Sequence, residues 1–374
     1  MGHHELSADL TRARYEHALD HYRRRSQRQV SDAVRRLVRV HHAPRRRPAA
    51  SGPNWTFWKA LGELGLLRAA STGDAGPRPG PLVWMTVMEE FGHALVAEPF
   101  VETVVAAGGL ILRLGSSSQH AWLLPAIAGG EAIWAVAHEE VFARHELNHV
   151  VATARRFRDG YLIQGAKVDV GAAAWAGKFI VSARTSGGRR DEAGVSLFVV
   201  DAQNRGITLD AARGGARADT MILSNVYVES AARLGEEGEA MAAMEASRAR
   251  CVAALCAQAT GAIAGLIAIV RRNDSAFDRP DRWNDMLAAQ QDAIALTQHL
   301  SARLSVEGRA AALLVSRTKS QVGYAARFVL EHAANFVSGR PDCEAVAHYG
   351  RYIQSINNQH GDPDYHQRRV WEAC

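Results

Sequence analysis

The sequence contains few cysteines and almost no lysine, and these shortages limit the kinds of site it can form. Its four cysteines include no Cys-x-x-Cys pair, so we expect neither a disulfide framework nor a structural zinc site. Only four of its 44 basic residues are lysines, and the formal net charge of +5 therefore comes from arginine. The arginine runs at residues 23–25 and 45–47 lack the interleaved aromatic residues of a base-stacking surface, so we expect no nucleic-acid partner.

Signals for membrane insertion, secretion and metal binding are also lacking. We identify no apolar run of the roughly 18 residues that a membrane-spanning helix needs, and no signal peptide at the N-terminus. The pairs His3-His4 and His41-His42 and the scattered Asp and Glu residues show no i, i+4 pairing typical of a metal-binding helix. We therefore expect a cytoplasmic protein with reduced cysteines, no membrane contact and no bound metal.

Length and composition predict a globular chain with more than one domain. At 374 residues, of which 47% are hydrophobic and 22% charged, the chain is long for a single core. Its hydrophobic pattern changes twice. We predict an α+β protein with an N-terminal helical domain at residues 1–131, a β-domain at residues 132–232 and a C-terminal helical bundle at residues 233–374.

Local signals support helices in the first region. Residues 29–40 carry apolar side chains at helical spacing, and Asn54 is a suitable N-cap for a following helix. Residues 71–81 hold three prolines and three glycines, which predicts a loop. Further helices are expected over residues 101–114 and 119–128.

The other two regions differ in their predicted secondary structure. Beyond residue 235, the Ala-rich helical patterns at residues 241–269 and 310–336 are typical of an antiparallel helical bundle. They carry more apolar surface than one bundle is expected to bury, so we predict a homodimer or homotetramer. The region before them contains short β runs that indicate a small barrel or sandwich, at residues 150–154, 160–165, 179–183, 195–200 and 221–228.

Several phrases in this order resemble the acyl-CoA dehydrogenase family. Residues 64–67 read Leu-Gly-Leu-Leu, and residues 160–167 read Gly-Tyr-Leu-Ile-Gln-Gly-Ala-Lys, similar to the family's Gly-Tyr-x-Leu-x-Gly-x-Lys. Residues 89–95 and the tail at residues 361–369 are most similar to a subgroup that includes the small subunit of pimeloyl-CoA dehydrogenase. The resemblance covers nearly the whole chain and implies the family's fold: a helical domain, a small β-domain and a four-helix bundle.

The resemblance also implies FAD as cofactor, although each motif that contacts it in the family is altered here. Glu139 and His145 stand at the Thr and Ser of a Thr-Glu-Pro-x-Ala-Gly-Ser-Asp segment, and Gly171 stands at the Thr of a Trp-Ile-Thr segment. The changes predict that the chain purified alone holds little FAD. The family's cofactor-binding positions correspond to Glu139, His145, Gly171, Arg279 (with Arg272 and Arg282 as alternatives), His332 and Gly361.

The family's catalytic base is the glutamate of a Tyr-Glu-Gly-Thr segment in the tail, and here the residue before the retained Gly361 is His360. Either His360 or Asp362 is the candidate that would remove the α-proton of an acyl-CoA substrate. The alternative is that His360 is a solvated loop residue and Asp362 a turn residue before Pro363.

Two functions are compatible with these features. The first is a flavoprotein that oxidises an acyl-CoA thioester at Cα–Cβ with FAD, using His360 or Asp362 as the base. The second is a non-catalytic subunit that forms a heteromer with a related, active acyl-CoA dehydrogenase subunit.

Overall fold

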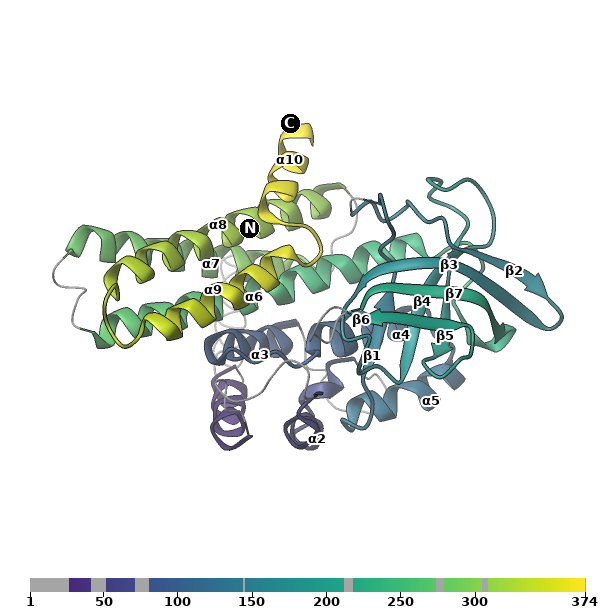
Figure 1. The fold of residues 1–374 in the computed structure, drawn as a ribbon, viewed down its shortest axis with the longest axis horizontal. Helices are drawn as coiled ribbons and strands as arrows, with labels where there is room; N and C mark the ends of the chain where they lie inside the picture. The colour runs from purple at the N-terminus through teal and green to yellow at the C-terminus, as the bar shows by residue number, and fades with distance from the viewer. Residues whose placement is uncertain are drawn as a thin grey trace, which may run out of the picture.

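The computed structural model describes residues 27–41, 52–70, 81–143, 145–211, 218–273, 279–304 and 309–373. It contains the predicted α+β arrangement of N-terminal helices, a sheet and a C-terminal helical bundle, and the bundle and sheet lie at opposite ends of the molecule (Figure 1). Residues 71–80 of the predicted loop lie outside the described residues.

The N-terminal region begins its helices at the caps that the sequence indicates. Asn54 accepts a hydrogen bond from the backbone N–H of Phe57, and Ser116 and Gln119 form a reciprocal capping box. The stretch predicted as one helix over residues 101–114 is instead a π-helix, a rare form that is frequent at functional sites, followed by a short α-helix. The elements are a helix at residues 27–41, α2 (Trp55–Glu63), η2 (Leu66–Ala70), α3 (Pro81–Ala94), the π-helix η3 (Val101–Gly108), α4 (Gly109–Leu114) and α5 (Ser117–Ala128).

The central region is one mixed sheet, mostly antiparallel, with the order β6-β7-β3-β2-β4-β5-β8 and with β1 parallel to β4. The short strand β8 lies just beyond the predicted domain boundary at residue 232 and pairs with β5 after the 3-10 turn η4 (Ser230–Ala232). The strands are β1 (Trp134–Ala137), β2 (Thr153–Phe157), β3 (Gly160–Val170), β4 (Lys178–Arg184), β5 (Val195–Asp201), β6 (Ile207–Ala211), β7 (Ala218–Glu229) and β8 (Arg233–Leu234).

The predicted strand at residues 150–154 forms only in part, because β2 begins at Thr153. The backbone N–H groups of Val151 and Ala152 donate instead to the carboxylate of Glu140, at 2.6 and 3.0 Å. A side chain from the loop after β1 therefore replaces ladder hydrogen bonds at this edge of the sheet.

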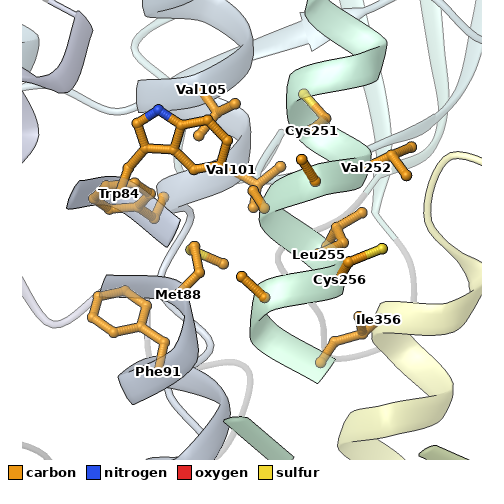
Figure 2. Close-up of a cluster of buried hydrophobic side chains, with 14 of the residues drawn as sticks. Trp84, Met88, Phe91, Val101, Val105, Cys251, Val252, Leu255, Cys256 and Ile356 are labelled. Carbon is orange, nitrogen blue, oxygen red and sulfur yellow. The ribbon is translucent and has the colours of Figure 1, made fainter. Parts of the chain in front are cut away.

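The C-terminal region packs tightly against the N-terminal helices. Figure 2 shows side chains of α3 and η3, among them Met88 and Val101, facing Cys251 and Leu255 of α6. The α3 and α6 backbones almost touch, since a Cβ at Gly261 would lie 1.9 Å from the Glu89 carbonyl oxygen. The helices are α6 (Met241–Arg272), α7 (Pro280–Ala302), α8 (Arg309–Phe336), α9 (Cys343–Asn358) and α10 (Pro363–Ala373), which projects from the bundle (Figure 1).

Helix α6 corrects one expectation from the sequence. By length and composition it could cross a membrane, contrary to the expectation that no apolar run is long enough, but 89% of its most apolar 18-residue window is buried inside the structure. It is the central helix of the bundle, where an apolar surface on all sides is normal. Its apolar surface is thus covered within one chain and gives no argument for the predicted homo-oligomer.

Candidate functional site

A cavity of about 90 Å³ lies where the residues after β1 and β3 meet η3, α6 and the C-terminal tail. This volume corresponds to roughly three water molecules of the liquid. A larger cavity of about 860 Å³, between α5 and the sheet, contains none of the predicted site residues. Three carboxylates and three imidazoles line the small cavity: Glu102, Glu139, Asp169, His138, His145 and His360.

The structure brings four of the eight predicted site residues to this cavity. Glu139, His145, Gly171 and His360 line it, although they come from three separate segments of the chain. Gly361 and Asp362 follow His360 directly but are not part of the lining.

The other two predicted residues lie elsewhere. Arg279 is the exposed residue before α7 and His332 lies within α8, and neither lines the cavity. The resemblance placed His332 at a glycine turn, but the stretch is uninterrupted helix, and the His332 ring bonds the carbonyl oxygen of Phe328 through Nδ1 at 3.0 Å.

Glu139 and His145 form an ion pair at the centre of the site, with 3.7 Å between Oε1 and Nδ1. Burial alone would raise the pKa of Glu139, but the neighbouring His145, His138 and His360 lower this pKa to about 2. The contact with Glu139 in turn raises the pKa of His145 against the opposing effect of burial. Glu139 is therefore a carboxylate anion at neutral pH.

The backbone around the cavity is strained. His145, Asp169 and His360 have φ angles of 67°, 52° and 55°, a left-handed conformation that costs a non-glycine residue roughly 1 kcal/mol or more. His145 is held in place because Arg248 of α6 and Tyr365 of α10 donate hydrogen bonds to its carbonyl oxygen, at 3.0 and 3.3 Å. The β-domain and the bundle are thus joined directly at the site.

The buried side chain of His366 holds the C-terminal segment that carries His360 in place through a hydrogen bond. His366, which is 1% exposed, donates from Nε2 to the carbonyl oxygen of His360 at 3.0 Å and accepts at Nδ1 from the Ser316 hydroxyl at 3.1 Å. Burial lowers the pKa of His366 to about 3, so the ring is neutral. Asp362 accepts from the backbone N–H of Tyr365 at 2.6 Å and caps α10, which is the turn role considered as the alternative for it.

A buried polar network lies under the cavity and was not found from the sequence. The Lys167 ammonium, with no exposed surface, donates to Glu140 at 2.6 Å, to Ser182 at 3.0 Å and to the carbonyl oxygen of His138 at 3.3 Å. Ser182 also contacts Nδ1 of His138 at 2.9 Å. Lys167 was noted only as part of the Gly-Tyr-x-Leu-x-Gly-x-Lys phrase. The available signal was the polar triplet at residues 138–140 directly after a buried strand.

An open cleft of about 590 Å³ adjoins the cavity, and His145, Leu147 and Arg248 line both. Arg368 and Arg369 of α10 lie in this cleft with Arg248. Within the described part of the chain, none of these three arginines forms an ion pair, although Arg248 donates to the His145 carbonyl oxygen and Arg369 to the Tyr365 hydroxyl.

Comparisons with known proteins agree with the fold. The family model of the acyl-CoA dehydrogenase N-terminal domain matches residues 24–131. Acyl-CoA dehydrogenase FadE27 of Mycobacterium tuberculosis is 29% identical over 183 residues, which cover 48% of this chain and 46% of that protein. The chain therefore carries the N-terminal domain of the acyl-CoA dehydrogenase family. No comparison tests the pimeloyl-CoA dehydrogenase subgroup.

Solved acyl-CoA dehydrogenases have the same fold over nearly the whole chain. A glutaryl-coenzyme A dehydrogenase in complex with glutaryl-CoA superimposes with a TM-score of 0.83 at 19% identity and covers 92% of this chain and 94% of its own. A variant of the Tcur3481-Tcur3483 steroid ACAD superimposes with a TM-score of 0.78 at 20% sequence identity. The match covers 94% of this chain and 98% of that chain. In sequence, the match spans less than half the length of FadE27.

The resemblance to acyl-CoA dehydrogenases implies FAD, but the residues at this cavity do not fit the cofactor. Ligand pockets usually measure about 300–1,000 Å³, well above the 90 Å³ found here. Glu139 is ionised where the family has a threonine, and its charge would oppose a flavin that gains electrons. A Cβ at Gly171, where the family has a Thr, would lie 3.0 Å from the Glu102 side chain. The resemblance and the structure therefore disagree about flavin at this site.

Proposed function

We propose that this chain is a CoA-thioester-binding subunit of a heteromeric acyl-CoA dehydrogenase and that it holds no FAD of its own. The observation that carries the proposal is the small cavity around ionised Glu139, at positions where the family contacts flavin. The oxidation of the acyl-CoA would take place on the related partner subunit.

The open cleft beside the cavity supports the proposed binding of CoA. The cleft beside the cavity has room for an elongated ligand and carries Arg248, Arg368 and Arg369. Four glutamates also line it, namely Glu146, Glu192, Glu245 and Glu372, so the arginines would have to bind the anionic groups directly. CoA is a polyanion, and arginine is well suited to phosphate groups because its guanidinium donates two parallel hydrogen bonds. A thioester whose CoA moiety lies in the cleft would reach the cavity past His145.

The comparisons support a heteromer. The name of the Tcur3481-Tcur3483 steroid ACAD pairs two proteins, and this structure covers 94% of the chain described here. We expect the partner to be a second acyl-CoA dehydrogenase chain that keeps the FAD motifs and the glutamate base that this chain lacks.

Calorimetric titration of the purified full chain with butyryl-CoA tests the proposal. We expect binding without added FAD, and Arg248→Gln with Arg369→Gln should weaken it about tenfold or more, since a hydrogen bond to a charged group contributes roughly 1.5–3 kcal/mol. The control pair is Arg282→Gln with Arg351→Gln, two exposed arginines outside the cleft. A wild-type chain that does not bind butyryl-CoA would refute the CoA-binding role.

A homomeric flavoenzyme is the second candidate, because His360 lines the cavity and an imidazole can act as a base near neutral pH. In that case the chain alone should exchange the α-protons of bound butyryl-CoA with D₂O, and His360→Ala should slow the exchange about 10²–10⁴-fold. Exchange that is absent in wild type, or unaffected by His360→Ala, would exclude this candidate.

A further inference from the structure

The polar network under the cavity determines which ring nitrogen of His138 carries the proton. The Lys167 ammonium has three protons, and its three acceptors are Glu140, Ser182 and the His138 carbonyl oxygen. The Ser182 hydroxyl oxygen therefore accepts from Lys167 and has its own proton to donate. Its remaining partner among the described residues is Nδ1 of His138, at 2.9 Å.

This order of donors makes Nδ1 of His138 an acceptor. A neutral imidazole with an accepting Nδ1 carries its proton on Nε2. The Nδ1 side of the ring faces Ser182, the ring is 8% exposed, and it lines the cavity. Among the described residues no acceptor is found for Nε2, and His138 lines the cavity, so this N–H is a donor without a protein partner beside the cavity.

We propose that His138 binds the carbonyl oxygen of an acyl thioester through its Nε2–H, as a neutral hydrogen-bond donor. This inference rests on the proposed function for the substrate class and adds the residue that recognises its reactive group. The cavity has room for a carbonyl group and a few neighbouring atoms. A donor about 2.7–3.2 Å from the carbonyl oxygen would orient the thioester in the cavity.

The surroundings keep His138 neutral. Burial, followed by the nearby Lys167 ammonium, lowers its pKa to about 4, and Arg248 acts in the same direction. The carboxylates of Glu139 and Glu140 oppose this shift but do not reverse it. The cavity wall also contains Glu102, Asp169, His145 and His360.

Infrared difference spectroscopy of bound butyryl-CoA, labelled with ¹³C at the carbonyl, tests the inference on the full-length chain. We expect the carbonyl band of the bound thioester to lie at lower wavenumber than that of the free thioester. In His138→Phe this shift should be lost, and in His332→Phe, at a residue of α8 outside the cavity, it should remain. An equal shift in wild type and His138→Phe would overturn the proposal.

Nitrogen NMR of the wild-type chain labelled with ¹⁵N-histidine provides a test that does not depend on the folding of a variant. We expect His138 to be the neutral Nε2–H form from pH 5.5 to pH 8, and Ser182→Ala identifies its signal by shifting it. A protonated ring at pH 6, or an Nδ1–H form, would overturn the proposal. Butyryl-CoA that binds without a carbonyl shift contradicts this inference alone, whereas failure to bind contradicts the proposed function as well.

Discussion

The carboxylate of Glu139 lies 3.7 Å from Nδ1 of His145, at positions where the acyl-CoA dehydrogenase family has a threonine and a serine that contact flavin. Both side chains line a cavity of about 90 Å³, and the charge of Glu139 is stabilised by its histidine neighbours. This chain therefore has an internal ion pair at the positions that the resemblance assigns to flavin contacts.

Replacing that pair with the family's residues should create affinity for FAD. In the variant Glu139→Thr with His145→Ser, the charge that opposes the flavin is removed and two bulky side chains become small. We expect the Kd for FAD, measured by flavin fluorescence quenching, to fall by at least about tenfold. Glu331→Thr with His299→Ser makes the same chemical changes at exposed helix positions and should have no effect.

The Lys167–Glu140 pair should be essential to the stability of the β-domain. Both side chains are buried, and Lys167→Ala would leave the Glu140 carboxylate without its cation. Loss of one partner of a buried pair typically costs about 3–5 kcal/mol in the free energy of unfolding. Lys178→Ala removes a partly exposed pair with Asp201 and should cost at most about 1 kcal/mol. Similar urea midpoints for the two variants would show that the buried pair contributes little.

The crossing of α3 and α6 should not tolerate a methyl group. Gly261→Ala would place a Cβ 1.9 Å from the Glu89 carbonyl oxygen, so the helices must separate, at a cost of roughly 1–3 kcal/mol or more. Gly350→Ala in α9 meets only ordinary contacts, at 3.5 Å and beyond, and should be neutral or stabilising by up to about 1 kcal/mol. Thermal unfolding of the two variants compares them directly, and equal melting temperatures would contradict the crossing geometry.

Stability should fall with acid because His366 is buried in the neutral form. Its folded pKa of about 3 lies below the ordinary value of 6.5, so between these pH values the unfolded chain binds the proton more readily. The stabilising effect is complete above pH 6.5 and decreases as the pH falls toward 3. We expect the melting temperature of His366→Gln to depend less steeply on pH between 7 and 4 than that of wild type. An equal slope would mean that His366 is not the titrating group.

The sequence predicts the parts of this fold that depend on local signals. Asn54 caps α2 as expected, because a helix N-cap involves residues only a few positions apart. The start of β2 was predicted wrongly, because the Glu140 carboxylate takes the backbone N–H groups of Val151 and Ala152. The 18-residue apolar stretch of α6 that is long enough to cross a membrane was not identified from the sequence, because the polar residues Gln258 and Thr260 interrupt it.

The candidate site was predictable only where the resemblance provided positions. It led to Glu139, His145, Gly171 and His360, which meet at one cavity. The role of His138 could not be predicted, because it depends on Lys167 of β3 and Ser182 of β4, two strands that follow it in the chain. Hydrogen-bond directions of this kind emerge only when the strands are placed side by side.

The flavin content of the full-length chain tests the central claim most directly. The chain should be purified alone from cells supplied with riboflavin, denatured, and assayed for released FAD by absorbance and fluorescence. The account predicts a colourless protein that releases almost no FAD and that copurifies with flavin only when a related acyl-CoA dehydrogenase chain is present. One FAD released per chain of the protein purified alone would contradict it.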